Sequence, residues 1–149
     1  MASLADIERH IAGLLLTAGG TYTSYTFTAE RILVNYVRFS NDKDRQRDLF
    51  EQGPEAIIQP GNETWDVRGR TGLGDITILL DFGFDPNEDL IFDDIEEFLK
   101  TIRELLAYGT YLGLQFSPKT ISVLKPSVDQ IKTAGLIEYK IECKGYLIC

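Results

Sequence analysis

The stretch ITILLDFGF, residues 76–84, decides the fold. It carries an apolar side chain at every second position without a gap, from Ile76 to Phe84. Successive side chains of a strand point to opposite faces of a sheet, so this period of two predicts a strand with one buried face. The glycines at 69–74 precede it, and residues 64–69 are expected to form the other arm of a hairpin.

A second stretch, DLIFDDIEEFLKTIRELLAYG at residues 89–109, has a period of three to four instead. This spacing predicts a long helix with one apolar face, which Gly109 is expected to end. The residues of that face are Ile91, Ile95, Phe98, Leu99, Ile102, Leu105 and Leu106.

The chain also begins with helical spacing. A helix is predicted from an N-cap at Ser3 to a stop at Gly19-Gly20. Its apolar residues are Leu4, Ile7, Ile11, Leu14 and Leu15.

The rest of the chain predicts mainly strands and loops. The charged stretch 40–54 is expected to be a loop with a helical turn at 48–50, and 125–134 a second loop. The closing strand would place Glu138, Lys140, Glu142 and Lys144 on a wet face. Strands are predicted at 21–28, at 32–37 with both faces buried, at 56–58, 64–67, 112–116, 120–124 and 137–149.

These elements together predict an α+β fold in one domain. With 149 residues and 44% hydrophobic composition, the chain can bury one core without disulfides. The expected architecture is a mostly antiparallel sheet packed with the N-terminal helix and with one long helix before the final strands.

Charge is unevenly distributed along the chain. Fifteen basic and 23 acidic residues give a net charge of −8, which disfavours general binding to a phosphate backbone. Residues 81–97 hold eight acidic residues and no Lys or Arg, whereas residues 31–70 hold seven basic and seven acidic residues.

The acidic stretch has two explanations, which the sequence leaves open. Acidic residues are favoured at the start of a helix by the helix dipole. Alternatively, they contact the basic loop of a neighbouring copy. In that case the partner-binding residues are Arg45, Arg47, Asp85, Asp89, Asp93 and Asp94.

Neither secretion nor membrane insertion is expected. Asp6 and Glu8 stand where a secretory signal has basic residues, and no run reaches the roughly 18 apolar residues that span a bilayer. Cys143 and Cys149, six residues apart in a predicted strand, would lie roughly 20 Å apart, too far for one disulfide. A soluble protein with reduced thiols is therefore expected.

The sequence carries no recognisable catalytic motif. His10 is the only histidine, and Cys143 is predicted to face the core, so neither forms an evident nucleophile–base relay. The glycines at 69–74 lack the Gly-Lys-Ser/Thr ending of a phosphate loop and precede a strand. The protein is expected to be neither an enzyme nor a cofactor-binding protein.

A partial calcium-loop pattern begins at Asp85. Asn87, Asp89, Asp93 and Glu96 continue the ligand spacing, but Leu90 stands where the sharp turn needs glycine. The element before the loop is a predicted strand rather than a helix. No metal site is therefore predicted.

Four stretches summarise the chain, and their order resembles the tail terminator proteins of long-tailed bacteriophages. They are SLADIERHIAGLLL (3–16), RILVNYVRF (31–39), DLIFDDIEEFLKTIRELLAYG (89–109) and, after a loop at 125–134, AGLIEYKIECKGYLIC (134–149). The charged stretch 40–54 and the long closing strand depart from the simplest members. The family has no invariant motif, so no functional residue is carried over.

The resemblance implies a structural role in the virion, assembled in the host cytoplasm. About six copies would close a ring at the top of the tail tube, stop tube growth and contact the tube protein and the neck or connector protein. DNA would only pass through an acidic lumen. The alternatives are another neck or tail protein, such as a connector or tube subunit, and a monomeric non-enzymatic binding domain with a cleft between sheet and helix.

Overall fold

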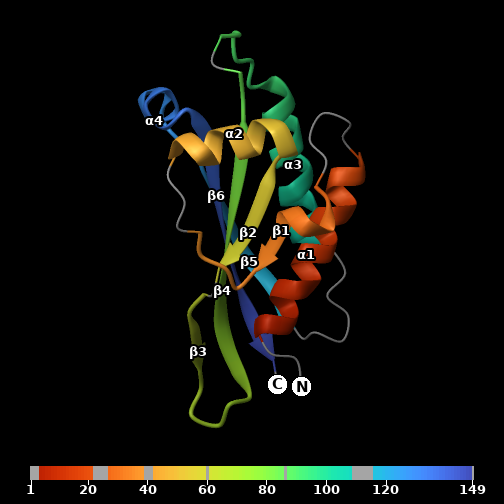
Figure 1. Ribbon diagram of the computed structural model, residues 1–149. Helices are drawn as coiled ribbons and strands as arrows, with labels where there is room; N and C mark the ends of the chain where they lie inside the picture. Colours follow the sequence, from red (N-terminus) through yellow and green to blue (C-terminus); the bar gives the residue numbers. More distant parts are fainter. Residues whose placement is uncertain are drawn as a thin grey trace.

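The computed structural model describes residues 4–21, 27–38, 42–59, 61–85, 87–108 and 116–148. These residues form a mostly antiparallel sheet with an N-terminal helix and a long helix before the final strands, which confirms the predicted α+β class (Figure 1). The elements in chain order are α1 (Leu4–Thr21), the short 3-10 helix η1 (Ala29–Arg31), β1 (Ile32–Val34), α2 (Asp42–Gln52), β2 (Glu55–Gln59), β3 (Glu63–Trp65), β4 (Thr71–Gly83), α3 (Asp93–Tyr108), β5 (Phe116–Leu124), α4 (Val128–Ala134) and β6 (Leu136–Ile148).

The sheet is built around the pair β4 and β6. These two 13-residue strands pair antiparallel over their whole length, from Thr71 opposite Ile148 to Gly83 opposite Leu136. The order is β1-β2-β4-β6-β5, with β3 on the free end of β4, and among the described strands only β1 and β2 pair in parallel. The predicted hairpin with the central strand is confirmed, but its first arm is 63–65 rather than 64–69, and Gly72 and Gly74, expected to precede the central strand, lie within it.

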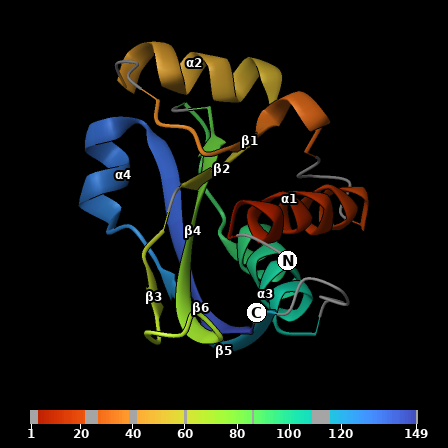
Figure 2. The same ribbon diagram turned by 90° about the horizontal axis from the view of Figure 1, so that it is seen from below.

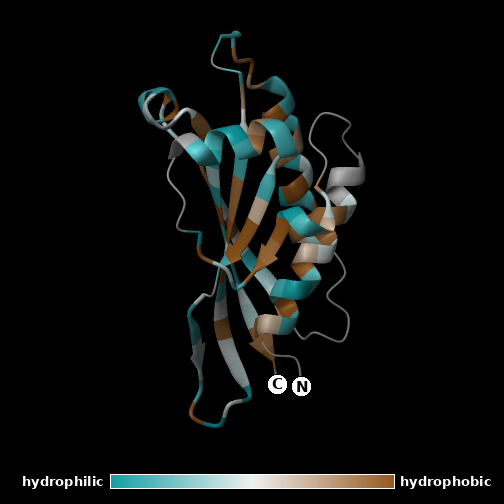
Figure 3. Cartoon of the chain, viewed as in Figure 1, coloured by the Kyte–Doolittle hydropathy of each residue, from teal (hydrophilic) through white to brown (hydrophobic). Residues whose placement is uncertain are grey.

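Helices α1 and α3 cover one face of the sheet, which we call the inner face (Figure 2). The alternation in β4 and β6 supplies this core, as predicted, because every second side chain points inward. Phe82 packs edge-on against Phe98 of α3 and Tyr139 of β6, with ring centroids 6.1 Å apart in both pairs. Figure 3 shows hydrophobic residues concentrated along these strands. The buried strand residues are Ile76, Ile78, Leu80, Phe82, Ile137, Tyr139, Ile141, Cys143 and Leu147.

The charged stretch 40–54 contains helix α2, so the prediction of a loop there was wrong. Leu49 and Arg45 lie one turn apart and face the sheet, where both are buried. The apolar period is absent because one of these inward positions is an arginine, while Phe50 is 58% exposed. The helix is therefore held by tertiary packing rather than by an apolar stripe.

The predicted loop at 125–134 also contains a helix, α4. Ser127 caps it, accepting a hydrogen bond from the Gln130 backbone N–H, and Gln130 reaches back to the Ser127 N–H. Gly135 ends the helix in the left-handed conformation with a φ of 70°. These caps stabilise a helix too short for its apolar spacing to stand out.

Several predicted boundaries were also wrong. Helix α1 continues through Gly19-Gly20 to Thr21, and the strand predicted at 32–37 ends at Val34 with half-buried side chains. Asn35 follows it with a φ of 54°, which bends the backbone out of the strand. Ile91 precedes α3 and is 71% exposed, so it does not belong to the apolar face of that helix. Ser3, Gly109, Cys149, residues 22–26 and residues 112–115 lie outside the described residues.

The β3–β4 hairpin projects beyond the helices at the end of the sheet opposite α2 (Figure 1). Its tip is the turn 66–70, closed by a hydrogen bond from the Asp66 N–H to the Thr71 carbonyl. Among the helices in the described part of the chain, none is both long and apolar enough to cross a bilayer.

We expect Gly83→Ala to lower the free energy of unfolding by about 1–3 kcal/mol. A Cβ atom at Gly83 would lie 2.4 Å from the Phe50 backbone nitrogen, so α2 would have to move away from β4. Urea denaturation measures the change. The control is Gly13→Ala in α1, where no atom lies within 4 Å of the added Cβ. It should be stabilising by about 0.5–1 kcal/mol. A Gly83 variant as stable as the wild type would contradict the packing of α2 on β4.

Candidate functional site

The other face of the sheet, the outer face, carries a buried group of charges beneath α2. Glu55 begins β2 and lies opposite Asp81 of β4 in the strand register. Arg45 enters from α2, and Arg38 from the segment after β1. We call these four residues, with Arg31 and Asp48, the arginine–carboxylate cluster.

Glu55 is the centre of this cluster and is only 1% exposed. Arg38 donates to both of its carboxylate oxygens, at 3.0 and 2.8 Å, and Arg45 Nη2 lies 2.8 Å from Oε1. Arg31 Nη1 lies 3.5 Å from Oε2, while its Nη2 donates to Asp48 and to the Gly53 carbonyl. One carboxylate therefore ties η1, the segment after β1 and α2 to the edge of β2.

Asp81 is the other buried carboxyl group of the cluster, and Arg45 Nη2 lies 2.5 Å from its Oδ2. Burial and the adjacent carboxyl group of Glu138 nevertheless raise the pKa of Asp81 to about 8. Arg45 opposes this shift, but its guanidinium is shared with Glu55. Glu138 is the partner of Asp81 in the register of β4 with β6. We call Asp81 and Glu138 the carboxyl pair, which holds a proton at neutral pH.

A cavity of about 450 Å³ opens beside the carboxyl pair on the outer face. Its apolar wall includes Ile57, Leu79 and Leu136, and Gln130 of α4 lines its side. Its volume lies within the range of small-ligand sites. The charged residues around it are Arg38, Arg45, Asp81, Lys125, Glu138 and Lys140.

Each cation around this cavity already contacts a carboxylate. Lys125 Nζ lies 2.7 Å from Glu96, and Lys140 Nζ lies 3.2 Å from Glu142. Arg38 is held by Glu55, and Arg45 by Glu55 and Asp81. Two buried atoms of these lining residues, Arg45 Nη1 and Asp81 Oδ1, make no hydrogen bond within the described residues, although Arg45 Nη1 lies 3.6 Å from Asp48 Oδ2.

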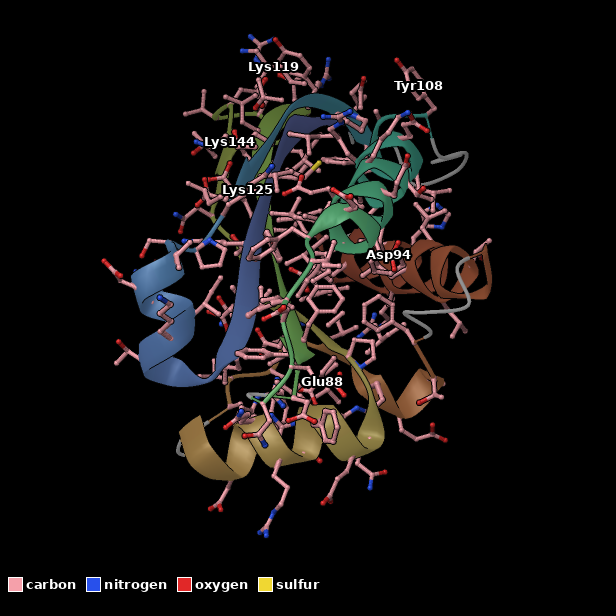
Figure 4. The ribbon with its side chains drawn as sticks, turned by 90° about the horizontal axis from the view of Figure 1, so that it is seen from above. Glu88, Asp94, Tyr108, Lys119, Lys125 and Lys144 are labelled. Carbon is pink, nitrogen blue, oxygen red and sulfur yellow. The ribbon has the colours of Figure 1, made fainter. Side chains whose placement is uncertain are left out.

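The partner-binding residues predicted from the sequence lie in different environments in the structure. Arg45 is 6% exposed and belongs to the cluster, so its guanidinium is not presented to a neighbouring molecule. Arg47 is exposed on the far side of α2. Asp89 is exposed, and Asp93 and Asp94 are exposed in the first turn of α3. Figure 4 shows Asp94 on the α1–α3 side of the sheet and Lys119, Lys125 and Lys144 on the β5–β6 side.

The partial calcium-loop pattern forms a turn. The Asp85 carboxylate accepts a hydrogen bond from the Asn87 N–H at 2.9 Å. Within the described residues, no three His, Cys, Asp or Glu side chains gather as metal ligands would. Cys143 is buried on the inner face, and burial raises the pKa of its thiol to about 11, so it is not a thiolate at neutral pH.

The tip of the β3–β4 hairpin is ordered by Asp66. Its carboxylate accepts hydrogen bonds from the Arg70 N–H at 2.9 Å and from the Thr71 hydroxyl at 3.4 Å, and Gly69 has a φ of 66°. Val67 is fully exposed at the tip. We call residues 66–70 the hairpin tip.

The outer face remains uncovered near this hairpin. Leu73 and Tyr146 lie opposite one another in the register and are each 46% exposed, and Ile148 is 53% exposed. Lys119 sits 5.4 Å from the centre of the Tyr146 ring. The outer face is therefore covered by α2 and α4 at one end and carries exposed apolar side chains at the other.

Sequence reasoning missed the cluster and the carboxyl pair. The sequence gives no role to Glu55 and counts Asp81 with the acidic stretch 81–97. The predicted wet face of the closing strand is confirmed, because Glu138 is exposed there, but its pairing with Asp81 is not evident from the sequence. The sequence signal for these buried groups is a carboxyl residue within or at the start of an apolar strand. These residues are Asp81 in ITILLDFGF (76–84) and Glu55 in EAIIQ (55–59). Buried carboxyl groups require partners, but the sequence does not say which arginines supply them.

The chain was also compared with known proteins. It matches no protein-family model, and no curated protein matches it significantly.

We expect Glu55→Gln to lower the free energy of unfolding by about 3–5 kcal/mol, because it leaves three arginines facing a neutral group. Urea denaturation followed by circular dichroism measures this loss. Glu51→Gln, the same substitution at an exposed position on α2, should change stability by less than about 0.5 kcal/mol. Similar losses in both variants would contradict the central role of Glu55.

The raised pKa of Asp81 predicts a specific pH dependence. Between the unfolded pKa of 3.8 and the folded pKa of about 8, the folded state binds more protons, so this group lowers stability as pH rises. In Asp81→Asn the group no longer titrates. The difference in unfolding free energy between wild type and variant should therefore change by up to about 1 kcal/mol per pH unit between pH 5 and 8. A difference independent of pH would show that Asp81 is ionised throughout.

Proposed function

We propose that this protein is a structural subunit that associates with copies of itself into a closed ring, as tail terminator proteins of long-tailed bacteriophages do. The observation that carries the proposal is the projecting β3–β4 hairpin, which extends past the layers that bury the core (Figure 1). Trp65 anchors the hairpin to the core, but the hairpin tip, residues 66–70, is exposed and contributes little to the stability of its own subunit. It is well placed to contact another subunit.

The exposed apolar residues beside the hairpin support the same proposal. Leu73, Tyr146 and Ile148 lie on the uncovered end of the outer face, where a neighbouring subunit would remove them from water. Burying apolar surface in this way stabilises association by roughly 25 cal/mol per Å² before the entropic costs of binding. A head-to-tail contact repeated by rotation closes a ring, and about six copies is the number that the family resemblance implies.

In the proposed setting the ring ends growth of the tail tube and contacts the tube protein on one side and the neck or connector protein on the other. The acidic residues at the start of α3, Asp93 and Asp94, are exposed and available to a lumen or to a partner surface. An acidic lumen would repel DNA and let it pass without binding. No catalytic step is part of this proposal.

A second candidate is a monomeric binding domain. The observation that favours it is the cavity of about 450 Å³ beside the carboxyl pair. In this case the chain would remain a single copy, and a small polar ligand would raise its melting temperature by binding the folded state.

Light scattering of the purified chain across a range of concentrations tests the proposal. We expect a mass of about six subunits at high concentration, and rings in negative-stain images of the same sample. A chain of 16.8 kDa at every concentration would contradict the ring proposal and favour the binding domain.

A further inference from the structure

The lining of the outer-face cavity carries more positive than negative charge. Burial and the neighbouring Glu138 raise the pKa of Asp81 to about 8, so at neutral pH the carboxyl pair contributes about one negative charge. The basic groups of the lining outnumber that charge, which favours an anion over a cation as the occupant. The basic residues that line the cavity are Arg38, Arg45, Lys125 and Lys140.

The two lysines can exchange their present partners for a ligand. Lys125 pairs with Glu96 and Lys140 with Glu142, and neither glutamate lines the cavity. All four side chains are at least 35% exposed. Exposed ion pairs contribute little to stability, because water already screens both charges. A bound anion can therefore take either ammonium group at little cost to the fold.

Arg38 and Gln130 also keep hydrogen-bond donors for a ligand. Arg38 donates to Glu55 through Nε and Nη2, which leaves its Nη1 group without an acceptor among the described residues. Its side chain is 29% exposed. Gln130 uses its carbonyl oxygen to cap α4 at the Ser127 N–H, so its amide nitrogen is not used by the cap. Donors from two separate segments thus border one cavity.

Most of the remaining lining is apolar. Ile57 of β2 lies opposite Leu79 of β4 in the strand register, and Leu136 at the start of β6 extends this wall. A ligand that fills the cavity therefore needs an apolar body as well as a charged end. The volume of about 450 Å³ suits a small organic molecule.

We infer that the outer-face cavity binds a small organic carboxylate with an apolar body. Arg38, Lys125 and Lys140 surround the carboxylate, and the apolar wall covers the body. A carboxylate suits these donors, because it accepts paired hydrogen bonds from a guanidinium group and attracts ammonium groups. Glu138 is the one ionised lining group that opposes the ligand. The inference rests on the second candidate function, whose ligand class it names, and it requires no ring.

Three compounds with the same six-carbon chain test the ligand class by isothermal titration calorimetry at about pH 6. Hexanoate is anionic, hexanol is neutral and hexylamine is cationic at this pH. We expect saturable binding of one hexanoate per chain, with hexanol about tenfold weaker and hexylamine weaker still. Hexylamine binding as tightly as hexanoate, or hexanoate without saturable binding in the millimolar range, would overturn the inference.

Two substitutions of exposed lining residues should change hexanoate binding in opposite directions. Lys140→Gln removes a favourable charge and should weaken binding by about threefold to tenfold, whereas Glu138→Gln removes the opposing charge and should strengthen it by a similar factor. Burial, the first cause of the raised pKa of Asp81, remains in Glu138→Gln, so Asp81 stays protonated at about pH 6.

Matched controls separate the cavity from the general charge of the chain. Lys144→Gln and Glu104→Gln make the same charge changes at exposed positions that do not line the cavity, and they should leave hexanoate binding unchanged. Thermal unfolding without ligand checks that every variant is folded. Equal affinity in both lining variants, or weaker binding in Glu138→Gln, would show that the anion does not bind here.

The outcomes distinguish this inference from the proposed functions. Hexylamine binding without hexanoate binding would overturn the anionic class and leave the cavity a ligand site. Light scattering of the same samples reports on the ring separately. Rings that bind none of the three compounds would overturn this inference and leave the ring proposal standing, whereas a monomer that binds hexanoate would support the inference and overturn the ring.

Discussion

The antiparallel pairing of β4 with β6 is the interaction on which the rest of the structure depends. Thirteen residues of each strand are in register, so both faces of the sheet are set by one alignment. On the inner face it stacks Ile76, Ile78 and Leu80 beside Ile141 and Cys143 under α1 and α3. On the outer face the same register places Asp81 beside Glu138 and Leu73 beside Tyr146. A shift by one residue would exchange these faces and expose the core.

The two ends of the outer face differ in how they are covered. Beneath α2, charged groups are buried and need neutralising partners. In the arginine–carboxylate cluster, arginines pair with Glu55. In the carboxyl pair, a bound proton removes one of the two negative charges. Towards the hairpin, apolar and basic side chains remain in water without a cover. The subunit thus combines matched buried charges beneath α2 with exposed apolar side chains beside the hairpin.

Much of the fold could be predicted because strands and helices have different periods. The alternation in ITILLDFGF and in the closing strand, and the three-to-four spacing of the segment before residue 109, are local patterns that report burial directly. Helices α2 and α4 could not be recognised in this way. The buried face of α2 contains Arg45 and Leu49, so its stability comes from contacts that its own sequence does not reveal, and α4 is short and depends on its caps.

The sequence by itself determined the α+β class, the position of the central and closing strands, the inner-face residues and the strongly acidic character of the chain. The tertiary structure alone decided which charges meet, because Arg38, Arg45, Glu55, Asp81 and Glu138 are brought together only through strand register and the placement of α2. It also decided that Arg45 is buried between α2 and the outer face of the sheet, while Arg68 and Arg70 are exposed to solvent. Charge alone does not distinguish these arginines, since burial depends on what packs around each one.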